Sequence, residues 1–293
     1  MLNDPANRGA LKPSVHYGPG GDPDYKPRLE VSDIDSDSYV DVVIADSTTA
    51  VTYIQRPDNP GTFQDGMLIG DGHEATDAAD INGDSVADVA TFDATGEHRV
   101  PDTLLYHRQS VSVPGDFSPI AAIDFDGSGQ DIGIADLNDD GRNDVAVSGF
   151  DTNSSFQTRG ILKTFYQSGT GDLEPFQSLR TSSNLFSNRL TLTDLDVDGR
   201  IEILVGNRTD AGSPNSVEIF AQDAQGKYRS TTLLVIPNDR ALVVPEMFSV
   251  RVNDLNNDGQ LDIGVSTGEI FVFFSLPGRP REFDSATRIA PAD

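Results

Sequence analysis

The stretch DLNDDGRND, residues 136–144, decides the fold because four close variants of it recur along the chain. The variants are DIDSDSYVD (33–41), DINGDSVAD (80–88), DLDVDGRIE (194–202) and DLNNDGQLD (254–262). All five have an acid at positions 1, 5 and 9, Asp or Asn at position 3, and Gly or Ser at position 6. Their starts lie 47, 56, 58 and 60 residues apart, so the chain is an internal repeat.

The segments that flank each copy are predicted to be β-strands. Apolar or alternating runs precede the motif, as in FSVRV at 248–252, and follow it, as in VAV at 145–147. A third run such as ILKTFY at 161–166 comes next, then a Gly–aromatic turn and a weaker fourth strand. Four strands in each unit predict an all-β fold, a β-propeller of four-stranded antiparallel blades. Five blades are recognisable, and six or seven are possible.

The chain is expected to form a single propeller domain over residues 29–290. Residues 1–28 contain one more strand-like piece, SVHY at 14–17. This piece is expected to supply the outer strand or strands that close the ring, or to belong to a truncated extra blade.

The repeated loops are predicted to bind calcium, at about five sites. Side chains at positions 1, 3 and 5 of a tight loop converge on one point, and Gly at position 6 permits the sharp reversal. The backbone carbonyl at position 7 and the carboxylate at position 9 complete an all-oxygen shell, which suits calcium better than magnesium, zinc or copper. The predicted ligands are Asp33, Asp35, Asp37, Tyr39 and Asp41; Asp80, Asn82, Asp84, Val86 and Asp88; Asp136, Asn138, Asp140, Arg142 and Asp144; Asp194, Asp196, Asp198, Arg200 and Glu202; and Asp254, Asn256, Asp258, Gln260 and Asp262.

Two other interpretations of the motif fail. An EF-hand needs an acid at position 12 and flanking helices, but position 12 is Ile, Thr or Val in every copy and lies in a predicted strand. Simple turn capping leaves three or four carboxylates repelling one another in each loop. Ser38 and Ser85 replace Gly at position 6 and predict two weaker sites. Asp124 to Asp131 resembles the motif, but its acids are misplaced, so it is interpreted as a turn between blades.

The composition limits the partners and the compartment. The net charge is −26, with 38 Asp against 9 Glu, which argues against binding to nucleic acid or to an anionic membrane. The chain has no cysteine and no apolar run long enough to span a membrane, so no membrane insertion is expected. The first residues do not read as a signal peptide. Calcium at a hundredfold excess over the dissociation constant adds about 2.7 kcal/mol per site, which cytosolic calcium cannot supply. A secreted, cell-surface or periplasmic location is therefore expected.

The loops, their strand context and the Gly–aromatic turns resemble the FG-GAP and VCBS repeats of integrin alpha chains and of secreted propeller proteins, including some fungal lectins. The resemblance covers residues 14–290. It implies a calcium-bound propeller, commonly seven-bladed, that serves in adhesion or recognition. It also implies that the loop ligands named above hold the ion.

The face opposite the calcium loops is the expected ligand-binding face, since the loops between second and third strands are long in blades two to four: 93–102, 151–160 and 206–216. We expect a recognition or adhesion module that binds an extracellular glycan or protein there, with no catalytic residues assigned. A polysaccharide lyase, dehydratase or other carbohydrate-active enzyme, and a structural spacer in a larger surface protein, stay open as alternatives. The candidate ligand residues are His98, Arg99, Asn153, Arg159 and Arg208.

Overall fold

The computed structural model describes residues 28–45, 49–71, 73–93, 102–152, 157–183, 186–209, 214–237 and 249–289. These residues form five antiparallel sheets of four strands, and in each sheet the strands pair in chain order. Among them there is no helix that is long and apolar enough to cross a membrane. The prediction of an all-β fold with four-stranded antiparallel blades is therefore confirmed, with five blades described.

The five sheets are named blades I to V in chain order. Blade I holds β1 (Arg28–Ser32), β2 (Asp41–Ala45), β3 (Thr49–Tyr53) and β4 (Met67–Asp71), and blade II holds β5 (His73–Ala79), β6 (Asp88–Asp93), β7 (Thr103–Ser110) and β8 (Val113–Asp124). Blade III holds β9 (Ser128–Ala135), β10 (Asp144–Thr152), β11 (Thr158–Gln167) and β12 (Leu173–Arg180). Blade IV holds β13 (Phe186–Thr193), β14 (Glu202–Arg208), β15 (Ser216–Gln222) and β16 (Tyr228–Val235), and blade V holds β17 (Ser249–Asn253), β18 (Asp262–Ser266), β19 (Ile270–Phe273) and β20 (Thr287–Ile289).

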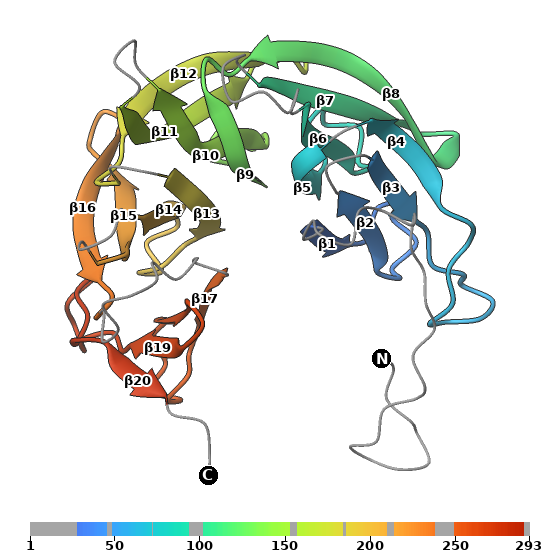
Figure 1. Ribbon diagram of the computed structural model, residues 1–293. Coiled ribbons are helices and arrows are strands. Elements are labelled where there is room, and N and C mark those ends of the chain that lie inside the picture. The colour runs from blue at the N-terminus through green and yellow to red at the C-terminus, as the bar shows by residue number, and fades with distance from the viewer. Residues whose placement is uncertain are drawn as a thin grey trace, which may run out of the picture.

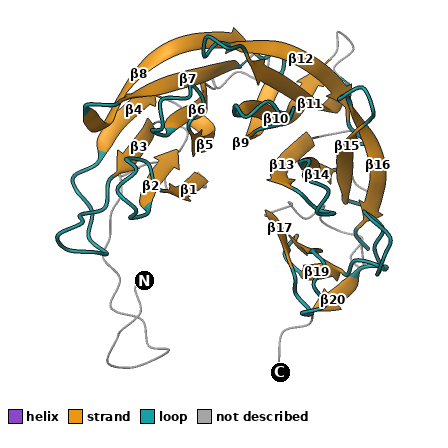
Figure 2. Cartoon of the chain, turned by 180° about the vertical axis from the view of Figure 1, so that it is seen from behind, coloured by secondary structure: helices purple, strands orange, loops and turns teal. Residues whose placement is uncertain are grey.

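The blades stand side by side along an arc, with blades I and V at its two ends (Figures 1 and 2). The first strand of each blade lies toward the centre of the arc and the fourth strand lies at its rim. The described blades leave the arc open between β1 and β17. The predicted closing strand in residues 1–28 lies outside the described residues, apart from Arg28 at the start of β1.

The core lies between the blades. A sheet inside the arc has two apolar faces, and each face packs against a neighbouring blade. Alternate residues of the second strand point to opposite faces, so Val145 and Val147 pack toward blade II whereas Ala146 packs toward blade IV. Phe92 of blade II and Phe125 of the next connection meet edge to face, with ring centroids 5.4 Å apart. Contacts between sheets follow the chain order, so each blade packs on the blades before and after it in the chain.

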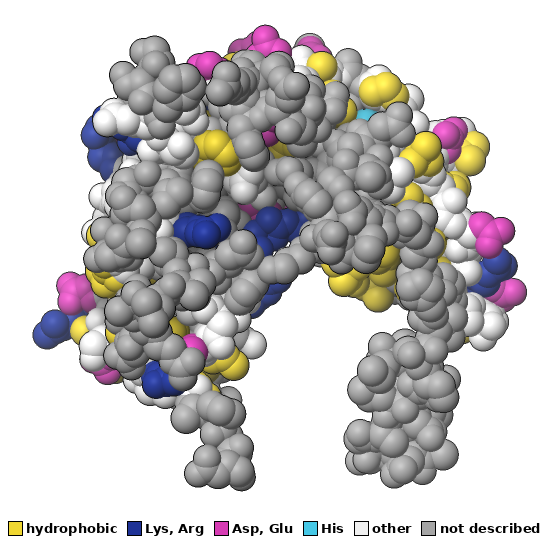
Figure 3. Space-filling model, in the orientation of Figure 1, with side chains coloured by type: hydrophobic (Ala, Val, Ile, Leu, Met, Phe, Trp, Pro, Cys, Tyr) yellow, Lys and Arg dark blue, Asp and Glu magenta, His cyan; other side chains and the backbone are white. Residues whose placement is uncertain are grey.

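The free face of blade I is apolar. Leu29 of β1 is 63% exposed, whereas Leu190 and Val250, at the same position relative to the loops of blades IV and V, are buried against the preceding blade. Hydrophobic side chains are visible over blade I beside the opening of the arc (Figure 3). Blade I therefore presents the type of surface that elsewhere in the arc forms an inter-blade contact.

Candidate functional site

The five motif loops connect the first and second strands of the blades, as the sequence predicted. They span residues 33–40, 80–87, 136–143, 194–201 and 254–261. Because every blade is an antiparallel meander that starts at the centre, these equivalent connections lie on one face of the arc. The connections between second and third strands lie on the other face.

Each loop is folded around the carboxylate at position 1. In blade III the N–H of Asp140 donates to Oδ1 of Asp136 at 3.2 Å, and the N–H of Gly141 donates to Oδ2 of Asp136 at 2.7 Å. The N–H of Arg142 then donates to Oδ1 of Asp140 at 3.0 Å. The same three hydrogen bonds occur in the other four loops. Such bonds turn the side chains at positions 1 and 5 inward, toward the loop centre.

The backbone of the loops is left-handed at two positions. Position 6 has φ between 72° and 90° in all five loops, including Ser38 and Ser85 at 72°, which confirms the predicted reversal. Position 4 is left-handed as well, which was not predicted from the sequence. Val197 occupies it in blade IV with a φ of 59°. A β-branched residue is strained in this region.

Replacing Val197 by glycine is expected to stabilise the protein by about 0.5–1 kcal/mol. Removing the Cβ relieves the left-handed strain of about 1–2 kcal/mol, and the greater freedom of glycine in the unfolded chain offsets part of the gain. Val197 is 76% exposed, so little packing is lost. Urea unfolding measures the change. Asn257→Gly at the same position of blade V is the control, and an equal gain there would contradict the strain argument, because Asn tolerates this backbone region.

The acid at position 9 is a buried clamp, a role that the sequence did not reveal. In blade III one oxygen of Asp144 accepts the N–H of Leu137 at 3.0 Å, and the other accepts the N–H of Gln167 at 2.8 Å. Asp144 is fully buried, and desolvation raises its pKa to about 6. Equivalent bonds to the loop N–H occur at Asp41, Asp88, Glu202 and Asp262. Each carboxylate oxygen keeps a further lone pair, so the clamp can also bind a cation.

A glutamine at the end of the third strand connects neighbouring blades in blades II, III and IV. The side-chain amide of Gln109 in blade II donates to the carbonyl of Ile34 in the loop of blade I at 2.7 Å. Gln167 and Gln222 donate in the same way to Ile81 and Leu137 of their preceding loops. Each of these loops is therefore held by its own blade and by the next one.

Carboxylate oxygens converge in two of the loops. One oxygen each of Asp33, Asp35 and Asp37 lie within 4.8 Å of one another, and so do those of Asp194, Asp196 and Glu202. Burial, followed by the nearby charges of Asp41 and Asp37, raises the pKa of Asp35 to about 6.

Blade IV also contains a buried oxygen without a hydrogen-bond partner. The side chain of Asp196 is only 6% exposed, and its Oδ1 has no partner among the described residues. Buried polar atoms are nearly always paired, so this oxygen is an open ligand position. An all-oxygen donor set of this kind fits a hard divalent cation.

The amides at position 3 differ among the remaining loops. Oδ1 of Asn138 and Oδ1 of Asn256 accept the N–H of the residue at position 5, at 3.0 and 2.8 Å. Asn82 instead donates its amide to Asp88 at 2.8 Å. The carbonyls at position 7, those of Tyr39, Val86, Arg142, Arg200 and Gln260, stay predicted ligands.

The motif-like segment from Asp124 to Asp131 contains the connection between blades II and III, residues 125–127, which agrees with its interpretation as a turn between blades. β8 ends at Asp124 and β9 begins at Ser128. Asp131 lies on β9 and accepts the N–H of Leu190 in blade IV at 3.0 Å. Its carboxylate therefore joins two blades and is not part of a cation loop.

Charged side chains on the central strands form an axial cluster, which the sequence analysis missed. The cluster consists of Arg28 and Glu30 on β1, Asp77 on β5, Asp131 on β9, Arg189 on β13 and Arg251 on β17. Asp77 accepts the N–H of Ile134 at 2.7 Å, so it joins blade II to blade III. Lys or Arg side chains are visible at the centre of the arc (Figure 3). The available signal was a charged residue three or five positions before the first residue of each motif.

Raising the pH from 5 to 8 is expected to lower the urea unfolding midpoint of the wild-type protein more than that of Asp77→Asn. Desolvation, and then the charge of Glu30, raise the pKa of Asp77 to about 8. The folded state therefore holds a proton that the unfolded chain releases near pH 4, so this stabilisation is lost as the pH rises toward 8. Asn mimics the protonated form and removes the dependence.

Urea midpoints at pH 5 and 8 in saturating calcium measure this difference. Asp65→Asn, at an exposed position, is the control. Parallel pH profiles for wild type and Asp77→Asn would contradict the assignment to Asp77.

In blades III and IV the connections on the opposite face are shorter than predicted, whereas in blade II β6 ends at Asp93 and β7 begins at Thr103, close to the predicted bounds. In blade III, β10 and β11 continue through Asp151 and Arg159, which are paired, so residues 151–152 and 158–160 of the expected loop 151–160 are strand. In blade IV, β14 ends at Arg208 and β15 begins at Ser216. Arg159 is exposed on blade III and Arg208 is half-buried on blade IV, at neighbouring positions of the arc. His98, Arg99 and Asn153 lie outside the described residues.

Two overlapping stretches, residues 136–205 and 194–265, match the model of the FG-GAP-like repeat. Together the two matched stretches cover residues 136–265. Each matched stretch begins at position 1 of one loop and ends in the strand after the next loop. The FG-GAP-like unit therefore crosses the boundary between two blades, where the Gln222 bond to Leu137 also lies.

Comparisons with solved structures give distant likenesses. The chain is 15% identical to an Agrocybe aegerita lectin that recognises non-reducing terminal N-acetylglucosamine, with a TM-score of 0.44 over 90% of this chain and 80% of the lectin. It is 16% identical to the periplasmic gluconolactonase PpgL of Pseudomonas aeruginosa, with a TM-score of 0.49 over 88% and 69%. No curated protein sequence matches the chain.

Proposed function

We propose that this FG-GAP-like propeller is a calcium-stabilised recognition module, which binds a glycan or a protein on the face opposite its calcium loops. The observation that carries the proposal is the single loop geometry built five times, with carboxylates turned inward around position 1. Because this geometry recurs in all five described blades, the same arrangement of carboxylates is repeated across one face of the arc.

Calcium suits the loops because their donors are carboxylate, amide and carbonyl oxygens on flexible turns. Calcium accepts 6–8 such ligands at variable geometry, whereas magnesium requires a strict octahedron. When bound, the ion supplies positive charge to the inward carboxylates. Asp196 Oδ1 is the open position that supports this in blade IV.

The compartment follows from the ion. Sites of moderate affinity are filled by millimolar extracellular or periplasmic calcium, and each site at a hundredfold excess over its dissociation constant adds about 2.7 kcal/mol. The chain has no cysteine, so calcium takes the place that disulfides hold in many exported domains. We therefore place the protein outside the cytosol.

The ligand-binding face is assigned to the connections between second and third strands. They are carried by rigid blades, and Arg159, at the start of β11 where one of them ends, is exposed and paired with Asp151 of β10. Connections on a rigid scaffold commonly carry binding residues. Calcium would act at a distance from the ligand, by fixing the blades that present these connections.

Equilibrium dialysis and a glycan array test the two parts of the proposal. Dialysis against calcium is expected to give about five ions per chain. The calcium-loaded protein is expected to retain specific glycans on the array, and Arg159→Ala is expected to weaken that retention at unchanged calcium content. A stoichiometry near zero would refute the calcium part, and an array without retained glycans would refute the glycan part.

A further inference from the structure

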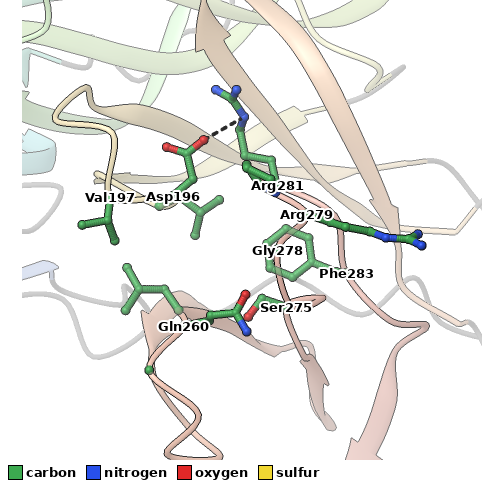
Figure 4. A pocket seen from close by; sticks show the side chains of 12 residues that line it. Asp196, Val197, Gln260, Ser275, Gly278, Arg279, Arg281 and Phe283 are labelled. Atoms are coloured by element: carbon green, nitrogen blue, oxygen red, sulfur yellow. Dashed lines mark ion pairs between the residues drawn. The ribbon is translucent and has the colours of Figure 1, made fainter.

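Arg281 of blade V reaches into the loop of blade IV. It lies in the connection between β19 and β20, and its Nε is 3.4 Å from Asp196 Oδ2 (Figure 4). Its Nη1 is 3.2 Å from Glu202 Oε1. Both partners are predicted ligands of the blade IV cation. A side chain from the neighbouring blade therefore contacts two members of this loop.

The negative charge of the blade IV loop explains why the guanidinium of Arg281 is tolerated there. Blades II, III and V have Asn at position 3, so they carry three carboxylates at positions 1, 5 and 9. Blade IV has Asp196 at position 3 and therefore carries four. The guanidinium of Arg281 brings the charge of this loop back to that of the other three.

The contact leaves part of the site open. Arg281 engages Oδ2 of Asp196, whereas the buried Oδ1 of the same residue has no partner among the described residues. A groove of about 220 Å³ between this loop and blade V is lined by Asp196, Gln260 and Arg281, among others. The guanidinium occupies one side of the carboxylate group and a second cation can enter from the other.

The backbone of Arg281 supports a specific role. Its φ is 60°, in the left-handed region, which costs a non-glycine residue about 1–2 kcal/mol. Strained residues persist where surrounding contacts fix them, and here those contacts are the two carboxylates of blade IV. The side chain of neighbouring Arg279 is 65% exposed and, within the described part of the chain, forms an ion pair only with Glu282 on its own turn.

We infer that Arg281 is a built-in counter-cation that sets the calcium affinity of the blade IV loop and couples it to the seating of blade V. The inference rests on the proposed calcium function. A fixed positive charge beside the carboxylates repels an incoming divalent ion. The blade IV loop therefore binds calcium more weakly than it would without Arg281. In the absence of the ion the same charge neutralises the loop and holds blade V against blade IV.

Calcium titration in competition with a chromophoric chelator tests the inference on wild type, Arg281→Gln and Arg279→Gln. Wild type is expected to bind calcium weakly at the blade IV loop, in addition to the two weaker loops that carry Ser38 and Ser85. Arg281→Gln is expected to tighten the blade IV site by about tenfold, the order of magnitude for one charge at this range. Arg279→Gln is expected to match wild type. The tightening should disappear when Asp194→Asn is added, because that change disables the blade IV loop.

Thermal unfolding gives a second readout that does not depend on resolving individual sites. In chelator, Arg281→Gln is expected to unfold at a lower temperature than Arg279→Gln, and in saturating calcium the two should converge. Arg281→Lys keeps the charge and should keep the weak site.

The outcomes separate the two proposals. A wild-type chain that binds no calcium overturns the proposed function itself. Normal calcium binding with identical titrations for Arg281→Gln and Arg279→Gln overturns only the role of Arg281, as does tightening that survives Asp194→Asn.

Discussion

Removal of calcium by a chelator is expected to lower the unfolding temperature of the chain by about 20 °C or more. Each filled loop contributes about 2.7 kcal/mol at a hundredfold excess of calcium over the dissociation constant. For a chain of this size 1 kcal/mol corresponds to about 2–4 °C. Five equivalent loops together contribute as much as the entire stability of an ordinary domain. Differential scanning calorimetry with calcium and with EDTA measures the shift.

Two controls identify calcium as the cause. Adding back calcium should restore the unfolding temperature, and adding magnesium at the same concentration should restore much less of it, because the loops lack strict octahedral geometry. An unfolding temperature that is the same with and without EDTA would refute the stabilising role of the ion.

Replacing Asp144 by alanine is expected to cost about 4 kcal/mol, the largest effect of a single substitution on the described loops. The substitution leaves the buried N–H groups of Leu137 and Gln167 without their acceptor. Each unsatisfied buried donor costs about 1–3 kcal/mol. Urea unfolding in saturating calcium measures the loss.

The matched variant is Asp140→Asn in the same loop. Asp140 is exposed and accepts an N–H only within the loop, so its change should weaken cation binding and leave the clamp intact. In chelator the difference between Asp140→Asn and wild type should vanish, whereas that between Asp144→Ala and wild type should persist. If both differences vanished, position 9 would be a cation ligand alone.

The repeat made most of the architecture predictable. The runs around DLNDDGRND carry β-type patterns, and they form β9, β10 and β11 in the structure. Gly141, Gly199 and Gly259 at position 6 marked the reversal, and the left-handed φ values confirm it. Local patterns suffice here, because strand, turn and loop are each determined within a few residues.

The features that were missed depend on partners far away in the sequence. The clamp at Asp144 bonds to Gln167, 23 residues on, and the Asp131 bond to Leu190 spans 59 residues. Arg281 contacts Glu202 across 79 residues. No periodicity encodes such pairs, since only the stacking of blades brings them together. The left-handed backbone at Val197 was hidden for another reason, because valine is disfavoured there.

The glutamine bonds run in one direction along the chain. Gln109, Gln167 and Gln222 each reach back to the loop of the blade before their own. During synthesis on the ribosome, a nascent loop therefore lacks this bond until most of the following blade has emerged. The loops of blades I, II and III are therefore expected to gain this bond in chain order, each only after the third strand of the following blade has been synthesised.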